Sequence, residues 1–311
     1  MDTLSGLSRP LGCERRFCGP LSFRTEALRS EESVATVLVF GKHRQEDRTD
    51  PSLHRASVQG DSKAIILRGS VVKRFYMENV KVLAFDVFGT VVDYYSTIIL
   101  EGAEINRAKG LDIDWGKFAL AWRGKYVPSM QRVMRGESDW LNLDALHRQS
   151  LEEVLREFGV TKLSENEKAH LNTVWHRLQP WSDAIPGLTR LRQRYTLTTL
   201  SNGNMALLVN MAKHSGLPWD CVLSAELIRA YKPDPRTYLM VGQLLGVSSS
   251  QVMMVAAHLE DLQAAQAQGL KTAYVPRPLE YGPNQPKATK PEASFDIVAT
   301  DFVNLAERLA V

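Results

Sequence analysis

The sequence predicts an α/β fold: a Rossmann-like, doubly wound parallel sheet with a helical cap inserted after its first strand. From residue 181 onward, short apolar strands alternate with helices of 10–15 residues, which is typical of βαβ units. Between residues 96 and 180 the periodicity is helical, without a convincing strand. We therefore divide the chain into an N-terminal extension (1–78), a core (79–95 and 181–311) and a cap (96–180).

The extension has no sustained periodicity apart from short apolar runs at 33–40 and 64–72. It contains 13 Lys+Arg and 10 Asp+Glu, so the whole net charge of +3 lies here and the rest of the chain is formally neutral. We expect this segment to be poorly ordered. Its Arg, Ser and Leu content allows a mitochondrial targeting peptide, although its acidic residues fit one poorly. Met77, just before the first strand, allows a shorter product.

Composition narrows the classes of partner. The chain is 44% hydrophobic and 23% charged, as in ordinary soluble enzymes, and no apolar run approaches the roughly 20 residues that span a bilayer. A neutral body without a Lys/Arg stripe gives no reason to expect nucleic acid. Three cysteines, two of them in the extension, do not make a disulfide framework. We expect a cytoplasmic enzyme with a small-molecule substrate and no membrane partner.

The elements follow in order along the chain. KVLAFD (81–86) is an apolar strand of the kind buried in parallel sheets, and it ends at Asp86 before a glycine turn. Asp139 is the expected N-cap of the third cap helix. The cap helices are expected at 96–110, 114–136, 138–160 and 164–178. Later strands are expected at 195–200, 221–227, 252–258, 271–277 and 295–300, and later helices at 204–216, 234–247, 259–269 and 301–310.

Polar residues follow four of the predicted strands. They are Asp86 and Thr90, then Ser201 and Asn202, then Lys232, and finally His258 and Asp261. The carboxyl ends of parallel strands meet at one edge of the sheet, where ligands bind in such folds. Each residue alone has a plainer interpretation, as a turn, a cap or a solvated side chain. Their joint order and spacing favour one small site.

Four motifs in this order resemble the haloacid dehalogenase superfamily, in particular its (S)-2-haloacid dehalogenase (type II) branch. They are FDVFGT (85–90), LSNG (200–203), YKPDP (231–235) and VAAHLED (255–261). The resemblance covers about residues 79–310. It implies that Asp86 is a nucleophile and that the helices after the first strand form the family's cap.

Two departures from the superfamily's phosphatases favour chemistry at carbon. Phosphatases carry Asp-x-Asp in the first motif, and the second Asp protonates the leaving group; here Phe88 stands in that position. The fourth motif offers Asp261 but Ala and His where more oxygen ligands would stand, and Mg²⁺ prefers oxygen. We therefore predict no metal and no cofactor.

The resemblance implies a two-step mechanism. Asp86 attacks C2 of a 2-haloacid, expels halide and forms an aspartyl ester that water then cleaves. Lys232 would keep Asp86 ionised, since a nearby cation lowers a carboxylate pKa by roughly 1–3 units. Asp261 would orient Lys232 or the water.

The resemblance also assigns substrate-binding roles. In the family, the arginine of a Trp-Arg pair in the cap receives the halide, and the matching pair here is Trp122-Arg123. The plainer interpretation of Arg123 is a salt bridge on the surface of the cap. The remaining residues are expected to hold the substrate carboxylate, order the nucleophile or lie near the site: Ser201, Asn202, Thr90, Phe88 and Tyr238. Helix packing alone would explain Tyr238 nearly as well.

The fourth motif departs from the type II pattern Ser-Ser-Asn-x-x-Asp, because it carries Ala256 and Ala257, and His258 in place of the asparagine. Histidine titrates near neutral pH, so His258 is either a general base for ester hydrolysis or a substitute for a hydrogen-bonding amide. The departure leaves other functions open. These are a Mg²⁺-dependent phosphatase on the same fold, a hydrolase of a non-halogenated metabolite, and a non-catalytic binding protein. A homodimer would be usual among relatives.

Overall fold

The computed structural model describes residues 79–288, 291 and 294–311, and four strands earlier in the chain by their backbone. The chain divides into two compact units, Met1–Glu78 and Asn79–Val311. In the first, the strands form an antiparallel sheet of order β1-β2-β4-β3. They are β1 (Thr25–Ser30), β2 (Ser33–Phe40), β3 (His54–Ser57) and β4 (Lys63–Leu67). Apart from these four strands, residues 1–78 lie outside the described part of the chain. The predictions that this segment is poorly ordered, or that it is a targeting peptide, fall on these residues.

The second unit is built on a five-stranded sheet of order β11-β10-β9-β5-β8, in which every neighbouring pair is parallel. The interior strand β5 is buried along its whole length, as a strand covered on both faces must be. The predicted α/β fold class is confirmed. The strands are β5 (Val82–Phe85), β8 (Thr196–Thr199), β9 (Val252–Ala256), β10 (Lys271–Tyr274) and β11 (Ile297–Val298).

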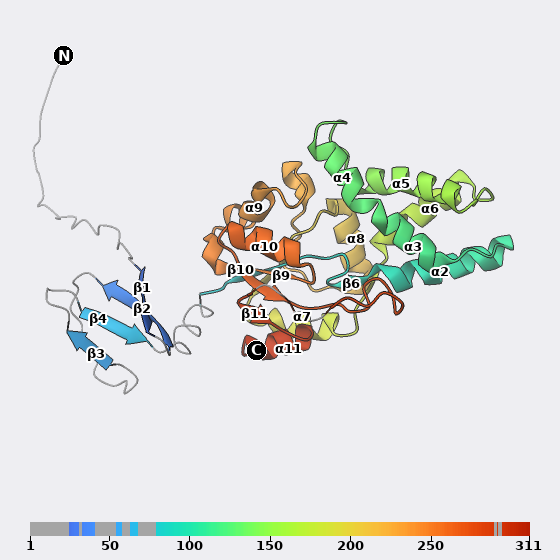
Figure 1. The fold of residues 1–311 in the computed structure, drawn as a ribbon. Helices are drawn as coiled ribbons and strands as arrows, with labels where there is room; N and C mark the ends of the chain where they lie inside the picture. Colours follow the sequence, from blue (N-terminus) through green and yellow to red (C-terminus); the bar gives the residue numbers. More distant parts are fainter. Residues whose placement is uncertain are drawn as a thin grey trace, which may run out of the picture. The chain divides into compact units, whose positions relative to one another are not determined.

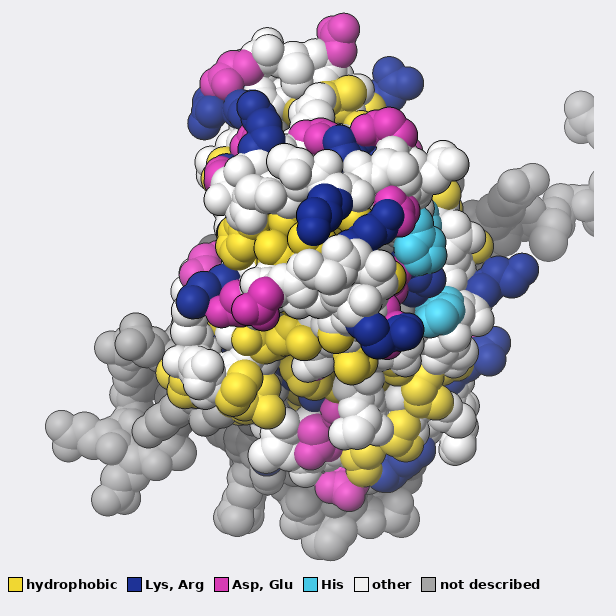
Figure 2. Space-filling model, turned by 90° about the vertical axis from the view of Figure 1, so that its right-hand side faces the viewer, with side chains coloured by type: hydrophobic (Ala, Val, Ile, Leu, Met, Phe, Trp, Pro, Cys, Tyr) yellow, Lys and Arg dark blue, Asp and Glu magenta, His cyan; other side chains and the backbone are white. Residues whose placement is uncertain are grey.

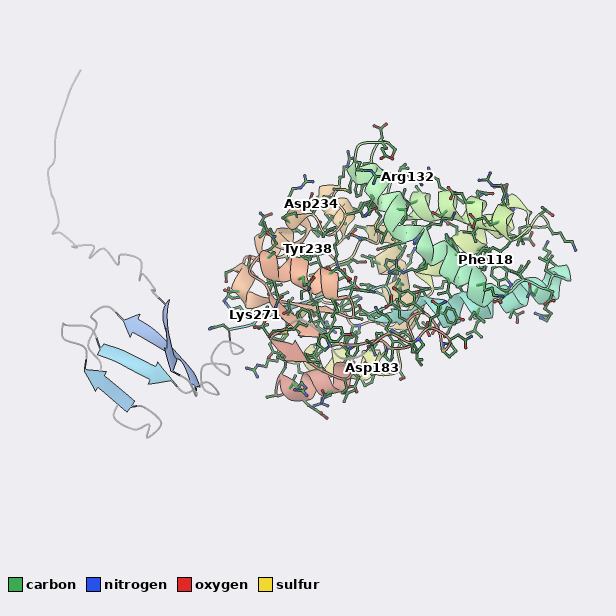
Figure 3. The ribbon with its side chains drawn as sticks, in the orientation of Figure 1. Phe118, Arg132, Asp183, Asp234, Tyr238 and Lys271 are labelled. Carbon is green, nitrogen blue, oxygen red and sulfur yellow. The ribbon has the colours of Figure 1, made fainter. Side chains whose placement is uncertain are left out.

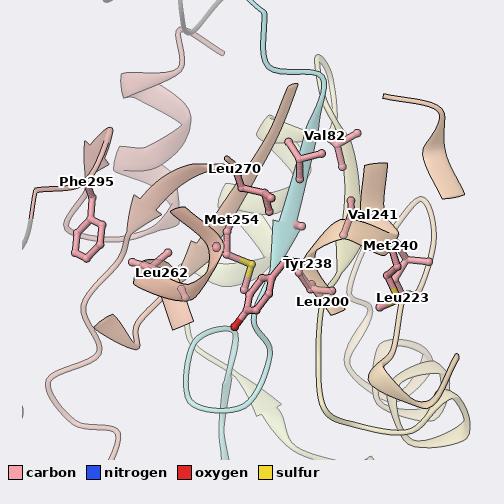
Figure 4. Packing of buried hydrophobic residues seen from close by; sticks show 14 of the residues in the cluster. Val82, Leu200, Leu223, Tyr238, Met240, Val241, Met254, Leu262, Leu270 and Phe295 are labelled. Atoms are coloured by element: carbon pink, nitrogen blue, oxygen red, sulfur yellow. The ribbon is translucent and has the colours of Figure 1, made fainter. Parts of the chain in front are cut away.

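Helices cover both faces of this sheet (Figure 1). Helices α9 and α10 lie over one face, and α7 and α11 lie together over the other. Figure 4 shows the packing on one face, where Val82 of β5 and Met254 of β9 meet Tyr238 and Val241 of α9 and Leu262 of α10. The helices are α7 (Ala184–Leu191), α8 (Met205–Ser215), α9 (Pro235–Leu245), α10 (Leu259–Ala267) and α11 (Phe302–Arg308), with a 3₁₀ turn η3 (Ser249–Gln251) before β9.

The cap is helical and follows the first strand of the sheet, as predicted. The short strands β6 (Val92–Asp93) and β7 (Gln179–Pro180) pair where the chain enters and leaves it. In Figure 3, Phe118 marks the cap and Tyr238 the core. The cap helices are α2 (Tyr94–Lys109), α3 (Trp115–Gly124), α4 (Tyr126–Met134), α5 (Leu143–Glu157) and α6 (Glu165–Asn172), followed by η1 (Thr173–His176).

Two details of the cap differ from the prediction. The helix expected over 114–136 is divided at Lys125, because Pro128 has no N–H to donate and is tolerated only in the first turn of a new helix. The N-cap of α5 is Asn142 and not Asp139; the Asn142 side chain accepts a hydrogen bond from the Ala145 N–H at 3.1 Å.

The strand expected at 221–227 is also wrong. In the described structure this segment makes two isolated bridges, from Cys221 to Thr198 of β8 and from Ser224 to Ser201 just after β8, and then forms the 3₁₀ turn η2 (Ala225–Ile228). Side chains take over the bonds that a strand would supply. The Asp220 carboxylate accepts from the Leu197 N–H at 2.9 Å, and the Ser224 hydroxyl donates to the Gly203 carbonyl at 2.5 Å.

The surface of the cap carries ion pairs of ordinary exposed kind, such as Lys125 with Glu157 at 2.6 Å and Arg148 with Glu165 at 2.7 Å. Figure 2, viewed from the cap end, shows positive and negative side chains interspersed on this face. Among the described residues, no helix combines the length and the apolar character needed to cross a membrane.

Candidate active site

The site begins at the carboxyl end of β5, an interior strand of the sheet. Asp86 follows Phe85 directly, and its N–H donates to the Val255 carbonyl of the neighbouring strand at 3.0 Å. The chain then turns sharply at Gly89, whose φ is +78°. Because β5 lies between β8 and β9, the residues that follow all three strands converge around Asp86.

Both carboxylate oxygens of Asp86 have partners. Oδ1 lies 3.3 Å from Nζ of Lys232, whereas Oδ2 accepts from the Thr90 hydroxyl at 2.7 Å and lies 2.9 Å from Nδ1 of His258. Burial alone would raise the pKa of Asp86, but Lys232 and His258 hold it well below its usual range. Asp86 is therefore a carboxylate anion with fixed orientation.

A second carboxylate positions Lys232. Its Nζ lies 2.6 Å from Oδ2 of Asp261, and Oδ1 of Asp261 accepts from the Tyr238 hydroxyl at 2.7 Å. The Lys232 side chain is 8% exposed, and its backbone N–H donates to Oδ1 of Asn202 at 2.8 Å. The structure thus brings the predicted residues Lys232, Asp261, Tyr238 and Asn202 together beside Asp86.

His258 contacts a carboxylate through each ring nitrogen. Nδ1 faces Asp86, and Nε2 lies 2.9 Å from Oε1 of Glu280. A neutral imidazole has only one N–H, so two carboxylate partners require the protonated ring. Burial by itself would lower the pKa of His258, but these two hydrogen bonds raise it to about 9. In the resting site His258 is an imidazolium.

Glu280 was not predicted from the sequence. Its side chain is fully buried, its Oε2 accepts from Nζ of Lys287 at 2.7 Å, and the His258 and Lys287 cations lower its pKa to about 2 against the effect of burial. It lies in the irregular segment after β10, whose carboxyl end is at the same edge of the sheet as Asp86. Its place after a predicted strand of the sheet is the one feature of the sequence that could have identified Glu280.

Two features hold Glu280 in place. Arg277 donates through Nε to the Thr90 carbonyl at 2.8 Å and through both terminal nitrogens to Asp183, at 2.7 and 2.9 Å; Figure 3 labels Asp183. Gly89 leaves the necessary space, because a Cβ there would lie 2.4 Å from Oε1 of Glu280. The turn after the nucleophile and this segment are therefore fitted to each other.

The cap contributes Arg123, from α3. A terminal nitrogen of Arg123 lies 3.9 Å from Oε1 of Glu280, and its guanidinium lies 4.1 Å from the ring centre of Tyr126. Phe88 packs edge-on against Tyr126 and Trp175. The predicted Arg123 thus reaches the core through Glu280, and Phe88 forms part of an aromatic contact between core and cap.

The other two predicted residues have structural bonds. Thr90, besides donating to Asp86, accepts from the Ala257 N–H at 3.0 Å. Ser201 is fully buried, and its Oγ accepts from the Gly203 N–H at 3.1 Å. Both bonds tie the ends of neighbouring strands to the turns that follow them.

The donor set does not fit Mg²⁺. The Lys232 ammonium lies between the two carboxylates, Asp86 and Asp261, that would have to hold the ion, and the His258 imidazolium lies on the other side of Asp86. The two positive charges next to these oxygens disfavour the binding of a third cation there. Within the described residues, no group of three or more His, Cys, Asp or Glu is arranged to hold a metal.

A carboxylate at the end of an interior parallel strand, a lysine beside it and a helical cap define the class: a cap-bearing α/β enzyme with a candidate aspartate nucleophile. The model of the haloacid dehalogenase-like hydrolases matches residues 80–269, so the chain belongs to this family. The resemblance drawn from its four motifs is confirmed.

Solved structures of the family are similar over nearly their whole length. The chain is 44% identical to the L-2-haloacid dehalogenase PA0810, with a TM-score of 0.72, over 74% of this chain and 99% of the other. It is 44% identical to the defluorinating L-2-haloacid dehalogenase Rha0230, also with a TM-score of 0.72, over 75% and 96%. By sequence, the chain is also 28% identical to an (S)-2-haloacid dehalogenase of Pseudomonas sp. (strain YL), over 65% of this chain and 84% of that protein.

Proposed function

We propose that the protein is a 2-haloacid dehalogenase, which replaces the halogen of a 2-haloalkanoic acid with a hydroxyl group. One observation carries the proposal: Asp86 is held as an anion by Lys232 and His258, while position 88 carries a phenylalanine that has no proton to give. Such a nucleophile suits a leaving group that departs as a stable anion. The names of the similar proteins support the same substrate class.

In the first step an oxygen of Asp86 attacks C2 of the substrate. The carbon–halogen bond breaks, the halide leaves with the bonding electrons, C2 is inverted, and an aspartyl ester forms. We assign the attack to Oδ1, because Oδ2 already holds Thr90 and His258 whereas Oδ1 has one contact at 3.3 Å. Arg123 receives the halide, as the family resemblance implies.

The second step uses His258 as the base. Formation of the ester removes the negative charge of Asp86, so His258 keeps only Glu280 as a carboxylate partner and its pKa falls. It releases the Nδ1 proton to solvent, while Glu280 retains the proton on Nε2. The free Nδ1 then takes a proton from the water that attacks the Asp86 carboxyl carbon.

Protons balance over this step. His258 passes the proton taken from water to the departing alkoxide, which leaves as the 2-hydroxyacid. The proton remaining on the new Asp86 carboxylic acid then moves to His258, which restores the ion pair of the resting site. One proton is released for each halide.

The test compares two reactions of the full-length protein. Incubation with (S)-2-chloropropionate in EDTA is expected to release chloride, and Asp86→Asn is expected to abolish the release without lowering the melting temperature by more than a few degrees. Incubation with p-nitrophenyl phosphate and Mg²⁺ is expected to release no phosphate. Metal-dependent phosphate release, or no halide from any 2-haloacid, would overturn the proposal.

A further inference from the structure

Unpaired polar atoms gather at one place in the cap. Among the described residues, the buried side-chain nitrogens and oxygens without a hydrogen-bond partner include Oη of Tyr94, Nε of Arg123, both ring nitrogens of His147 and Nε1 of Trp175. Nearly all buried polar groups in native proteins are paired, and each unpaired one costs about 1–3 kcal/mol. We call these four residues the polar cluster.

The cluster is contiguous and contacts Phe88, in the turn that follows the nucleophile. The His147 ring stacks on the Trp175 ring with centres 4.2 Å apart, and the Tyr94 ring stacks on Trp175 at 5.9 Å. The Arg123 guanidinium lies 5.4 Å from the centre of Tyr94. Phe88, two residues after Asp86, packs 5.8 Å from Trp175 and 6.4 Å from His147.

Most of these groups are neutral donors. His147 is 2% exposed, and burial lowers its pKa to about 3, so it carries one N–H and one lone pair at neutral pH. Burial also raises the pKa of Tyr94 well above its usual range, so its hydroxyl keeps the proton. Trp175 can only donate.

This chemistry exceeds what a halide requires. A halide is a single atom, and Arg123 already offers it a cation. The three neutral side chains, His147, Tyr94 and Trp175, suit an uncharged oxygen on the substrate, such as a hydroxyl or a carbonyl. A hydrogen bond to that oxygen removes the cost of the unpaired donors without burying another charge.

We propose that His147, together with Tyr94 and Trp175, binds a hydrogen-bonding substituent that the substrate carries beyond C2. The preferred substrates are then 2-haloacids with an oxygen on C3, and His147 is a specificity-determining residue. The inference rests on the proposed function and adds to it the chemistry of the substrate's side chain.

The first test compares substrates of equal size. (S)-2-Chloro-3-hydroxypropionate and (S)-2-chlorobutyrate differ only by OH against CH₃. We expect kcat/KM to favour the hydroxy acid by at least about tenfold, the effect of one buried hydrogen bond. His147→Phe should bring this ratio close to one while turnover of chlorobutyrate persists, and His147→Asn, which keeps a donor, should retain part of the preference.

The second test measures the free protein. Tyr94→Phe and His147→Phe remove polar atoms that have no partner, so each is expected to raise the melting temperature while lowering the substrate ratio. Tyr238→Phe is the matched control: its hydroxyl is bonded to Asp261 at 2.7 Å, and its loss should lower the melting temperature.

The outcomes are distinct. The inference is overturned, and the proposed function left standing, if both variants leave the kcat/KM ratio of the two substrates unchanged. An equal loss of kcat/KM on both substrates would have the same meaning, because it is the signature of a role toward halide alone. A lowered melting temperature of Tyr94→Phe and His147→Phe would also overturn the inference. Absence of halide release by the unmodified protein from these substrates and from 2-chloropropionate would overturn the proposed function, and this inference with it.

Discussion

Nδ1 of His258 and Oδ2 of Asp86 lie 2.9 Å apart, so the candidate nucleophile and the candidate base share one hydrogen bond. The proton on His258 is stabilised as long as Asp86 is an anion and is destabilised once Asp86 becomes a neutral ester. In the proposed mechanism the base is therefore inactive before the first chemical step and becomes available after it. This contact would then set the order of the two proposed steps.

The pKa of His258 should respond to the charge of Asp86. It is about 9 in the resting site, and Asp86→Asn, which removes the charge and keeps the shape, should lower it by about 1–3 units. An NMR titration of labelled histidine measures both values. Glu137→Gln, on an exposed part of the cap, is the control and should leave the pKa unchanged. An equal pKa in the Asp86→Asn protein would contradict the proposed coupling.

Replacement of His258 should trap the ester. His258→Asn restores the amide of the type II pattern and removes the base, so steady-state turnover should fall by roughly 10²–10⁴-fold, while one halide per site is still released in a burst. Mass spectrometry of the peptide containing Asp86 should find the added acyl mass. His214→Asn, on the exposed side of α8, should behave as the unmodified protein. Unimpaired turnover of His258→Asn would show that the ring only replaces an amide.

Removal of Lys232 should cost both stability and activity. Lys232→Met leaves Asp86 and Asp261 buried without their shared cation, so the free energy of unfolding should fall by about 3–5 kcal/mol. The pKa of Asp86 should rise, which moves the acid limb of kcat/KM to higher pH. Urea denaturation and a pH–rate profile measure the two effects. The control is Lys117→Met, which breaks an exposed ion pair with Asp114 and should change the free energy of unfolding by less than about 1 kcal/mol. If Lys232→Met and Lys117→Met lost the same free energy of unfolding, that result would be inconsistent with a stabilising buried bridge at Lys232.

Two glycines with positive φ allow a matched comparison. Gly89 and Gly110 both have positive φ, but a Cβ on Gly110 would meet nothing, whereas one on Gly89 would strike Glu280. Gly110→Ala should therefore cost only about 1 kcal/mol of backbone strain. Gly89→Ala should cost more, and it should also slow ester hydrolysis because Glu280 is displaced. Similar kcat values for the two variants would argue against a role for Glu280.

The part of the site that could be predicted is the part fixed by the sheet. Asp86, His258 and Asp261 follow apolar strands, and parallel strands bring their carboxyl ends to one edge whatever the detailed packing. Lys232 reaches the same edge although the strand expected before it is a 3₁₀ turn. Periodicity is sufficient to find such strands, so their meeting point could be inferred from the sequence.

The rest depends on contacts that periodicity does not encode. Glu280 is supplied by an irregular segment, and the Arg277 contacts that hold it join residues about 94 and 187 positions apart in the chain. His147 and Trp175 look like ordinary core positions of the cap, and periodicity does not show that their ring nitrogens lack partners. The prediction of Asp139 as the N-cap of α5 was wrong because Asn caps helices as well as Asp does, and residue type alone does not locate the first turn.

The segment that carries Arg277 and Glu280 has a practical consequence for protein engineering. Substrate recognition is assigned to cap helices, whereas the group that orients the hydrolytic base comes from a separate stretch between β10 and β11. Libraries that diversify the cap can therefore alter which acids are accepted while the hydrolytic group is kept constant. A second library, restricted to residues 278–287 with Glu280 retained, would tune the lifetime of the covalent intermediate independently.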